Sequence, residues 1–184
     1  MSAADDPSQT PLSPSLRLAS VNDMLLYRLG QLSAVAGAMV VRLCEGGHGI
    51  TRREWAVLAQ LHGQPDGLLP SVLAERMRRD RSRTSRALTA LLGKGLVERH
   101  TLAHDRRTAC VRLSPAGEAL YGELMPQVQA INARILEALD DQERRTFDAA
   151  LERLRVRAQA LLDETGAELP KADRRRGGRS RRPA

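Results

Sequence analysis

The sequence predicts a mainly helical protein that carries one short β-hairpin. Apolar residues recur every three or four positions along several separate stretches, which is the period of an amphipathic helix. Two short β-prone stretches, 96–101 and 109–113, flank a polar turn at 102–108, as in a two-stranded hairpin. With 184 residues and only 2% aromatic residues, the chain suits one compact domain with appended elements and a core of Leu, Ala and Val.

Four helices are expected before the hairpin, and each has a start signal. The signals are Ser20 with Asp23 before the first helix, the capping box Thr51–Glu54 before the second, Pro70 in the first turn of the third, and Asp80 before the fourth. Glycines at 46–47, 63–67 and 95 end the first, second and fourth helices. The fourth helix carries an apolar stripe, while its Arg, Ser and Thr residues lie largely off that stripe.

Two further helices are expected after the hairpin. Ser114-Pro115 starts a long helix, and Asp140 with Glu143 starts a last one that Gly166 ends. Residues 1–20 and 167–184 lack a sustained apolar period, so both segments are expected to be disordered.

Positive charge is concentrated in the middle of the chain. The net charge is +7, and residues 51–113 carry 13 basic and 6 acidic side chains, whereas residues 114–166 carry 6 basic and 10 acidic ones. Three helices and a hairpin, with the basic residues on the last helix and the hairpin, form the order of a winged helix-turn-helix. Such a helix fits the major groove of DNA and an Arg-tipped hairpin reaches the minor groove, so the pattern favours DNA binding over a merely solvated basic face.

Several segments in this order resemble the MarR family of bacterial transcriptional regulators. They are Trp55–Leu61, Leu73–Arg76, Asp80–Arg86, Lys94–Arg99, Asp105–Arg107 and Val111–Gly117. The most specific parts are Asp80–Arg86 and the wing pattern, met by Asp105, Arg107, Leu113 and Ser114. The resemblance implies a winged helix-turn-helix module with long N- and C-terminal dimerisation helices.

The resemblance also implies which side chains face DNA. They are Arg81, Ser82, Arg83, Thr84, Ser85, Arg86 and Thr89 on the recognition helix, Arg79 in the turn before it, and Arg106 and Arg107 at the wing tip. Phosphates would repel Asp105, so this residue is expected to support the wing by pairing with a nearby arginine. Arg86 is either a DNA contact or only the partner of Asp105.

The expected organisation has five parts. They are an N-terminal segment at 1–20, a dimerisation helix within 21–50, the winged module at 51–113, dimerisation helices within 114–166 and a basic tail at 167–184. The apolar seams of the terminal helices are too long for a three-helix core to cover, so a homodimer is expected, with recognition helices about one DNA turn, ~34 Å, apart. The tail is either a solvated charge run or a salt-sensitive, sequence-independent DNA anchor.

A small-molecule effector is also expected from the resemblance, because many members of the family release DNA when a small aromatic acid or phenol binds. The candidate pocket residues are Tyr27, Arg28, His48, Arg53, Trp55 and His62, which supply aromatic walls and cations. Each of them also suits an ordinary core or solvated role. The expected function is a repressor that this ligand releases, with no resident cofactor and no metal.

Other functions are weighed against this one. A nucleoid-type dimer would coat DNA without sequence preference, and a redox-sensing regulator would need a reactive thiol among Cys44 and Cys110, which are expected to be reduced. The sequence has no phosphate-cradling glycine loop and no catalytic triad tied to a recognisable fold, so an enzyme is not expected. It also has no apolar run long enough for a bilayer, and a cytoplasmic, nucleoid-associated protein is expected.

Overall fold

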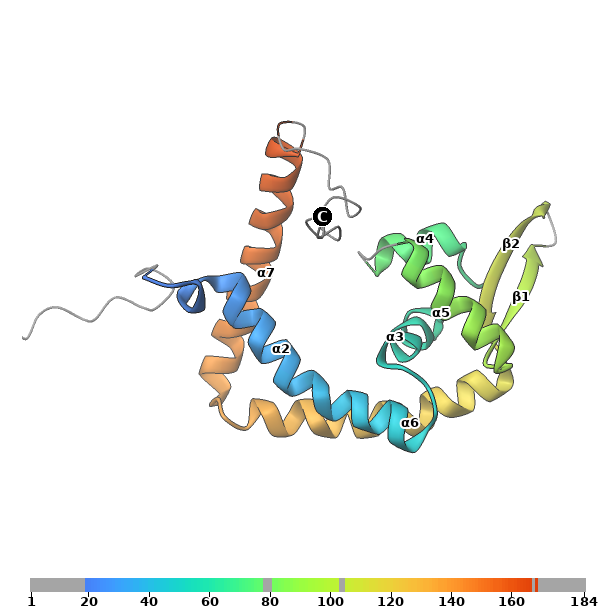
Figure 1. Ribbon diagram of the computed structural model, residues 1–184, viewed down its shortest axis with the longest axis horizontal. Coiled ribbons are helices and arrows are strands. Elements are labelled where there is room, and N and C mark those ends of the chain that lie inside the picture. Colours follow the sequence, from blue (N-terminus) through green and yellow to red (C-terminus); the bar gives the residue numbers. More distant parts are fainter. Residues whose placement is uncertain (1–18, 78–80, 103–104, 167, 169–184) are drawn as a thin grey trace, which may run out of the picture. The chain divides into compact units, whose positions relative to one another are not determined.

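The computed structural model describes residues 19–77, 81–102, 105–166 and 168. Contacts between residues divide it into two units, one ending at Ile135 and one beginning at Leu136, and each unit is described by itself. Helices and one two-stranded sheet make up its regular structure, which confirms the predicted mainly helical, winged helix-turn-helix fold class (Figure 1). Within the described ranges, no helix is both long and apolar enough to cross a membrane.

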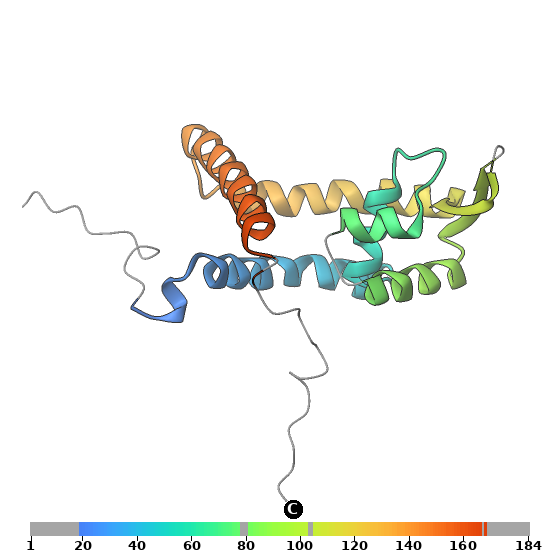
Figure 2. The same cartoon turned by 90° about the horizontal axis from the view of Figure 1, so that it is seen from above.

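The elements follow the predicted order. The first unit contains the 3-10 turn η1 (Val21–Asp23), α2 (Leu25–Val41), the π-helical turn η2 (Arg42–Gly47), α3 (Arg52–Leu61), α4 (Pro70–Arg76), α5 (Arg81–Gly93), β1 (Val97–Leu102), β2 (Asp105–Leu113) and nearly all of α6 (Pro115–Leu136). The second unit contains α7 (Asp141–Thr165). In the first unit α2 and α6 run antiparallel, one toward the winged core and the other away from it (Figure 2).

The N-terminal helix starts later than predicted. The Ser20–Asp23 capping box forms, but it caps the short turn η1: the Ser20 hydroxyl accepts from the Asn22 N–H at 3.2 Å, and the Asp23 carboxylate accepts from the Ser20 N–H at 2.9 Å. The Met24 backbone is extended, with ψ of 134°, and this breaks the helical path. The long helix therefore begins at Leu25, after a break that the apolar pattern does not reveal.

The other described capping signals act where they were predicted. Thr51 accepts from the Glu54 N–H at 3.2 Å while the Glu54 carboxylate accepts from the Thr51 N–H at 2.6 Å, and Asp140 with Glu143 forms the same box before α7. Pro70 is the first residue of α4. These interactions join residues three apart, which is why the sequence alone reveals them.

The hairpin is longer than predicted. β1 and β2 pair antiparallel, with Val97 opposite Leu113, and β2 begins at Asp105 instead of 109, so the connection is shorter than the predicted turn at 102–108. Leu68 adds an unpredicted bridge, because it exchanges two backbone hydrogen bonds of 2.9 Å with Val111. Gly67 permits this approach: its φ is +73°, and a Cβ there would lie 2.6 Å from the Val111 carbonyl oxygen.

A single apolar core holds the winged module together. Its fully buried side chains include Leu58, Leu61, Leu73 and Leu91, and α6 contributes Leu124. Side chains from α3, α4, α5, the hairpin and α6 therefore share one core, and burying each Leu contributes about 1.5 to 3 kcal/mol.

The start of α6 is bonded directly to the turn between α5 and β1. The Ser114 N–H donates to the Leu96 carbonyl at 3.1 Å, and the Ser114 hydroxyl donates to the Gly95 carbonyl at 2.6 Å while it accepts from the Gly117 N–H. Gly117 is buried, and a Cβ on it would overlap the Leu96 carbonyl oxygen. The first turn of α6 can lie this close to the backbone only with glycine at this position.

A buried ion pair joins α3 to the end of α5. Glu54 is 3% exposed, and the Lys94 ammonium donates to its carboxylate at 2.9 Å and to the Gly49 carbonyl at 2.8 Å. Burial by itself raises the pKa of Glu54, but the Thr51 hydrogen bonds and the Lys94 ammonium outweigh burial and hold that pKa below its usual range. The charged pair is therefore part of the folded structure at neutral pH.

We predict that Gly117→Ala destabilises the protein by about 2 kcal/mol, because the new methyl group must displace a backbone carbonyl. Gly122→Ala is the matched control on the same helix, since a Cβ there has no atom within 4 Å. This control should be neutral or stabilising by up to about 1 kcal/mol. Urea denaturation measures both, and equal free energies of unfolding for the two variants would contradict the close contact.

We also predict that Lys94→Met lowers the free energy of unfolding at pH 7 by about 1 to 3 kcal/mol, since it removes a partner of a buried carboxylate. The Glu54 contribution is fully present above the ordinary glutamate pKa of about 4.3 and is lost as pH falls through the lower folded-state pKa. Carboxyl groups titrate roughly between pH 3 and pH 7. Over this range, the free energy of unfolding should therefore fall less steeply with acidification in Glu54→Gln than in the wild type.

Arg112→Met is the control for this pair, because the Arg112–Glu98 bridge of 2.8 Å on the hairpin leaves its carboxylate side chain 43% exposed, against 4% for Glu54. An exposed pair contributes only about 0 to 1 kcal/mol. A loss in Arg112→Met as large as that in Lys94→Met would show that burial is not what makes the Glu54 pair important.

Candidate DNA-binding surface and adjoining cavity

The exposed face of α5 carries five of the ten side chains that were predicted to face DNA. Exposed residues on this helix are Ser82, Arg83, Ser85, Arg86 and Thr89. The helix packs on α3, α4 and β1, and Figure 1 shows it next to α3 and α4. Its buried Ala87, Leu88 and Leu91 belong to the core, so the exposed face is directed away from the core. A row of Arg, Ser and Thr side chains on one helix face is the set that reads base edges and phosphates in a major groove.

Three hydrogen bonds order this face. The Arg86 guanidinium donates to the Ser82 carbonyl at 3.3 Å and to the Ser82 hydroxyl at 3.4 Å, one turn earlier, and the Thr89 hydroxyl donates to the Ser85 carbonyl at 3.0 Å. Arg86 is thereby turned along its own helix. The Arg83 guanidinium makes no ion pair with a carboxylate among the described side chains.

Thr84 differs from the prediction that it faces DNA. Its side chain is 1% exposed, and it lies on the same side of α5 as the buried Ala87, Leu88 and Leu91. The helix must place one residue of its first turn against the core, and Thr84 occupies that position. It supports the position of the reading face from beneath.

Some predicted site residues lie outside the part of the chain that the structure describes. This holds for Arg79 in the turn before α5, for the basic tail at 167–184 apart from Glu168, and for the side chains of Arg81, Asp105, Arg106 and Arg107. The backbone of Asp105, Arg106 and Arg107 does belong to β2, in the part of the hairpin next to the connection between the strands. These assignments stay predictions.

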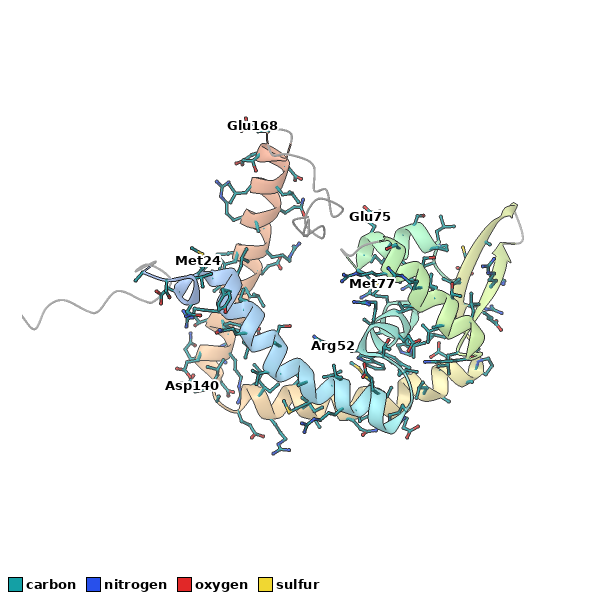
Figure 3. All side chains as sticks on the ribbon, in the orientation of Figure 1. Met24, Arg52, Glu75, Met77, Asp140 and Glu168 are labelled. Carbon is teal, nitrogen blue, oxygen red and sulfur yellow. The ribbon has the colours of Figure 1, made fainter. Side chains whose placement is uncertain are left out.

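A cavity of about 510 Å³ lies in the first unit between α2, α3, α6 and the end of α4. Its apolar lining includes Val40, Trp55, Met77 and Val128, and two cations, Arg52 and Arg53, lie on the same rim of α3. Figure 3 labels Arg52 at the start of α3 and Met77 just after α4. The volume falls within the range of roughly 300 to 1,000 Å³ that small-molecule sites occupy. We call this hollow the effector cavity.

Two of the six predicted effector residues line this cavity, Arg53 and Trp55, and the other four do not. Tyr27 and Arg28 lie on the exposed first turns of α2, and His48 lies 3.9 Å from Glu123. His62 stacks on Tyr121 with ring centroids 3.9 Å apart and contacts Glu118 through Nδ1 at 2.9 Å. These histidines therefore contact α6 at positions outside the cavity.

Sequence reasoning missed Arg52, Val40, Met77 and Val128 as cavity residues. Arg52 could have been predicted from the sequence, because it lies four residues before Ala56 and seven before Ala59. At this spacing the three residues share one face of α3, and all three line the cavity. Val40 and Val128 come from helices far apart in the sequence. Nothing in the local pattern of either helix places it against Trp55.

The two thiols give no support to a redox site. Cys44 is fully buried, and burial, followed by the nearby Glu45, raises the pKa of its thiol while Arg52 opposes this shift. Cys110 is 4% exposed on β2. A raised pKa and a lack of solvent access both disfavour the thiolate that a sensor requires. Among the described residues, no group of three or more His, Cys, Asp or Glu side chains could hold a metal ion.

Comparison with known proteins agrees with this geometry. The family model described as MarR family matches residues 48–108, which include α3, α4, α5 and most of the hairpin. A MarR-family transcriptional regulator from Silicibacter pomeroyi is 29% identical, with a TM-score of 0.61 over 73% of this chain and 90% of that chain.

Two solved structures of lower identity share the fold. S. aureus MepR, crystallised with DNA, is 22% identical with a TM-score of 0.66 over 72% of this chain and 97% of that one. CouR from Rhodococcus jostii RHA1, bound to p-coumaroyl-CoA, is 21% identical with a TM-score of 0.65 over 74% of this chain and 94% of that one. Through the match over the winged module and the MarR-family structure from S. pomeroyi, the chain is similar to the MarR family of transcriptional regulators.

Proposed function

We propose that this chain is a homodimeric, sequence-specific DNA-binding repressor that a small aromatic carboxylate or phenol releases from a near-palindromic operator. The observation that carries this proposal is the exposed Arg, Ser and Thr face of α5 beside the hairpin, in the most basic part of the chain. MepR, which shares the fold, was crystallised with DNA. Repression follows where the operator overlaps a promoter, because the bound dimer then excludes the polymerase.

Dimerisation is supported by the terminal helices, each considered alone. α7 is 25 residues long and has no buried residue, although Phe147, Leu151, Leu154 and Leu161 repeat along one side at steps of four, three and seven. On α2, Leu26 is 80% exposed and Val35 is 74% exposed. A second copy of the chain would cover such stripes and would also supply the second recognition helix that a palindromic site requires.

Ligand response is supported by the effector cavity. Trp55, Val40 and Val128 offer apolar walls for an aromatic ring, and the Arg52 and Arg53 guanidinium groups suit a carboxylate or phenolate. Such a ligand would bind close to α3, which packs directly on the DNA-reading helix α5. CouR, which shares the fold, was crystallised with an aromatic acyl thioester, p-coumaroyl-CoA.

We predict that Leu154→Glu raises the dimer Kd by about 30-fold or more, because a change at the centre of an interface typically costs roughly 2 kcal/mol or more. Arg153→Glu, on the neighbouring exposed position of α7, is the matched control and should leave the dimer intact. Sedimentation velocity over a micromolar concentration series measures both. Equal Kd values for the two variants would place the dimer interface elsewhere.

We predict that the wild type binds its own promoter region about 10³-fold or more tightly than random DNA at equal salt. Arg83→Ala should reduce this ratio by about 10-fold or more, since a side chain that reads a base contributes roughly 1 to 3 kcal/mol of discrimination. Arg145→Ala on α7 is the control. A wild-type ratio near unity would instead identify a protein that coats DNA without sequence preference.

We predict that benzoate, 4-hydroxybenzoate or phenol weakens promoter binding, with the largest effect from the compound that fits both the apolar wall and the two arginines. Fluorescence anisotropy with labelled promoter DNA measures this in the presence of each compound. Quenching of Trp55, the single tryptophan, reports binding directly. Quenching without any change in DNA affinity would contradict the proposed release mechanism.

A further inference from the structure

Arg53 lines two separate hollows of the first unit. One is the effector cavity, and the other is a smaller hollow of about 220 Å³ between the start of α3 and the exposed face of α5. We call the smaller one the arginine hollow, because Arg53, Arg83 and Arg86 line it. Thr51 and Glu54 at the N-terminus of α3 complete its polar lining. A single side chain thus adjoins both the proposed effector site and the proposed DNA-reading face.

The arginine hollow is suited to an anion. Its one carboxylate, Glu54, is already bonded to the Lys94 ammonium at 2.9 Å and to the Thr51 N–H at 2.6 Å. Among the described residues, none of the three arginines that line the hollow is in an ion pair. Three guanidinium groups around one small hollow, beside the positive end of a ten-residue helix, leave the hollow with an excess of positive charge.

Arg53 itself is incompletely satisfied. Its Nε atom is buried and has no hydrogen-bond partner among the described residues. Buried donors in folded proteins nearly always have an acceptor, so this guanidinium nitrogen lacks the oxygen partner that an anion, a ligand or a water would supply. This observation is independent of the charge count, and it falls on the one arginine that the two hollows share.

The available anion on the α5 side is a DNA phosphate. Arg83 and Arg86 are exposed on the face that we assign to DNA, and most protein–DNA hydrogen bonds go to the backbone. The available anion on the other side is the carboxylate or phenolate of an effector, which Arg52 and Arg53 adjoin together. The Arg53 guanidinium can be aligned with one of these anions at a time.

We propose that Arg53 couples the two sites: with Arg83 and Arg86 it binds a backbone phosphate of DNA, and an acid in the effector cavity competes with that phosphate for the same guanidinium. This inference rests on the proposed function. It requires only a change in the direction of one long side chain. Linkage then demands that the acid weakens DNA binding by the same factor by which DNA weakens acid binding.

The test compares Arg53→Met with variants that touch one hollow each. DNA affinity is measured with and without 4-hydroxybenzoate for the wild type, Arg53→Met, Arg52→Met in the effector cavity and Arg83→Met in the arginine hollow. Arg53→Met should bind promoter DNA about 10-fold more weakly, lower the slope of log affinity against log salt by about 1, and lose the response to the acid.

The single-hollow variants should behave differently. Arg52→Met should need more acid but still lose DNA affinity at saturation, and Arg83→Met should bind DNA weakly yet keep the fold-change caused by the acid. Arg53→Lys, which keeps the charge, should recover most of the DNA affinity. Thermal unfolding followed by circular dichroism verifies that each variant is folded. An Arg53→Met variant with the wild-type salt slope, or with the wild-type response to acid, would overturn the proposal.

Two further arms separate the possible failures. Sodium phosphate and sodium chloride at equal ionic strength should weaken DNA binding to the same extent. If phosphate weakens it more, and Arg53→Met abolishes that difference, the arginine hollow is a site for free phosphate. That result would overturn the assignment of the hollow to DNA. A wild type without sequence preference or without any response to acid overturns the proposed regulator itself. A responsive, specific wild type with an equally responsive Arg53→Met overturns the coupling alone.

Discussion

The turn between α5 and β1, residues 94–96, holds the parts of the winged module in register. Lys94 bonds to Glu54 and to the Gly49 carbonyl, which fixes the end of α5 against the start of α3. Gly95 adopts φ of +67° and so reverses the chain. The Leu96 carbonyl accepts from Ser114 and lies against Gly117, so the first turn of α6 rests on the same turn. A displacement of α6 must therefore break these bonds or move the end of the DNA-reading helix with it.

Basic residues and uncovered apolar side chains are concentrated in different segments of the chain. The basic excess lies in residues 51–113, whereas residues 114–166 are net acidic and carry the uncovered apolar stripe of α7. Acidic helices are repelled by phosphates, so within residues 51–166 the winged module is the part that DNA attracts. The apolar stripes are then free to bind another protein surface.

Most of the fold could be predicted because its signals are local. The capping boxes at Thr51 and Asp140 join residues three apart, and the apolar period directly indicates a helix. The errors arose where distant parts of the chain decide the outcome. The bridge between Leu68 and Val111 joins residues that are 43 positions apart in the sequence. The burial of Thr84 depends on how α5 is rotated about its axis against its neighbours. The effector cavity is harder still, since its walls come from helices that only the tertiary fold brings together. Residue type was enough to predict Arg53 and Trp55 as cavity residues, but not to predict that Arg53 adjoins two hollows.

The position of Arg53 between two hollows bears on how a ligand can regulate DNA binding. The Glu54–Lys94 pair resists movement of α3 against α5, and the α6 junction resists movement of α6 against the end of α5. A mechanism that needs a large rotation would have to break them. Competition for one guanidinium leaves them intact. Its strength is limited to what the Arg53 contact itself provides, about 10-fold in DNA affinity, which is the loss expected of Arg53→Met. A rearrangement of the whole module could exceed that limit, so the size of the ligand effect itself distinguishes a shared side chain from a moving helix.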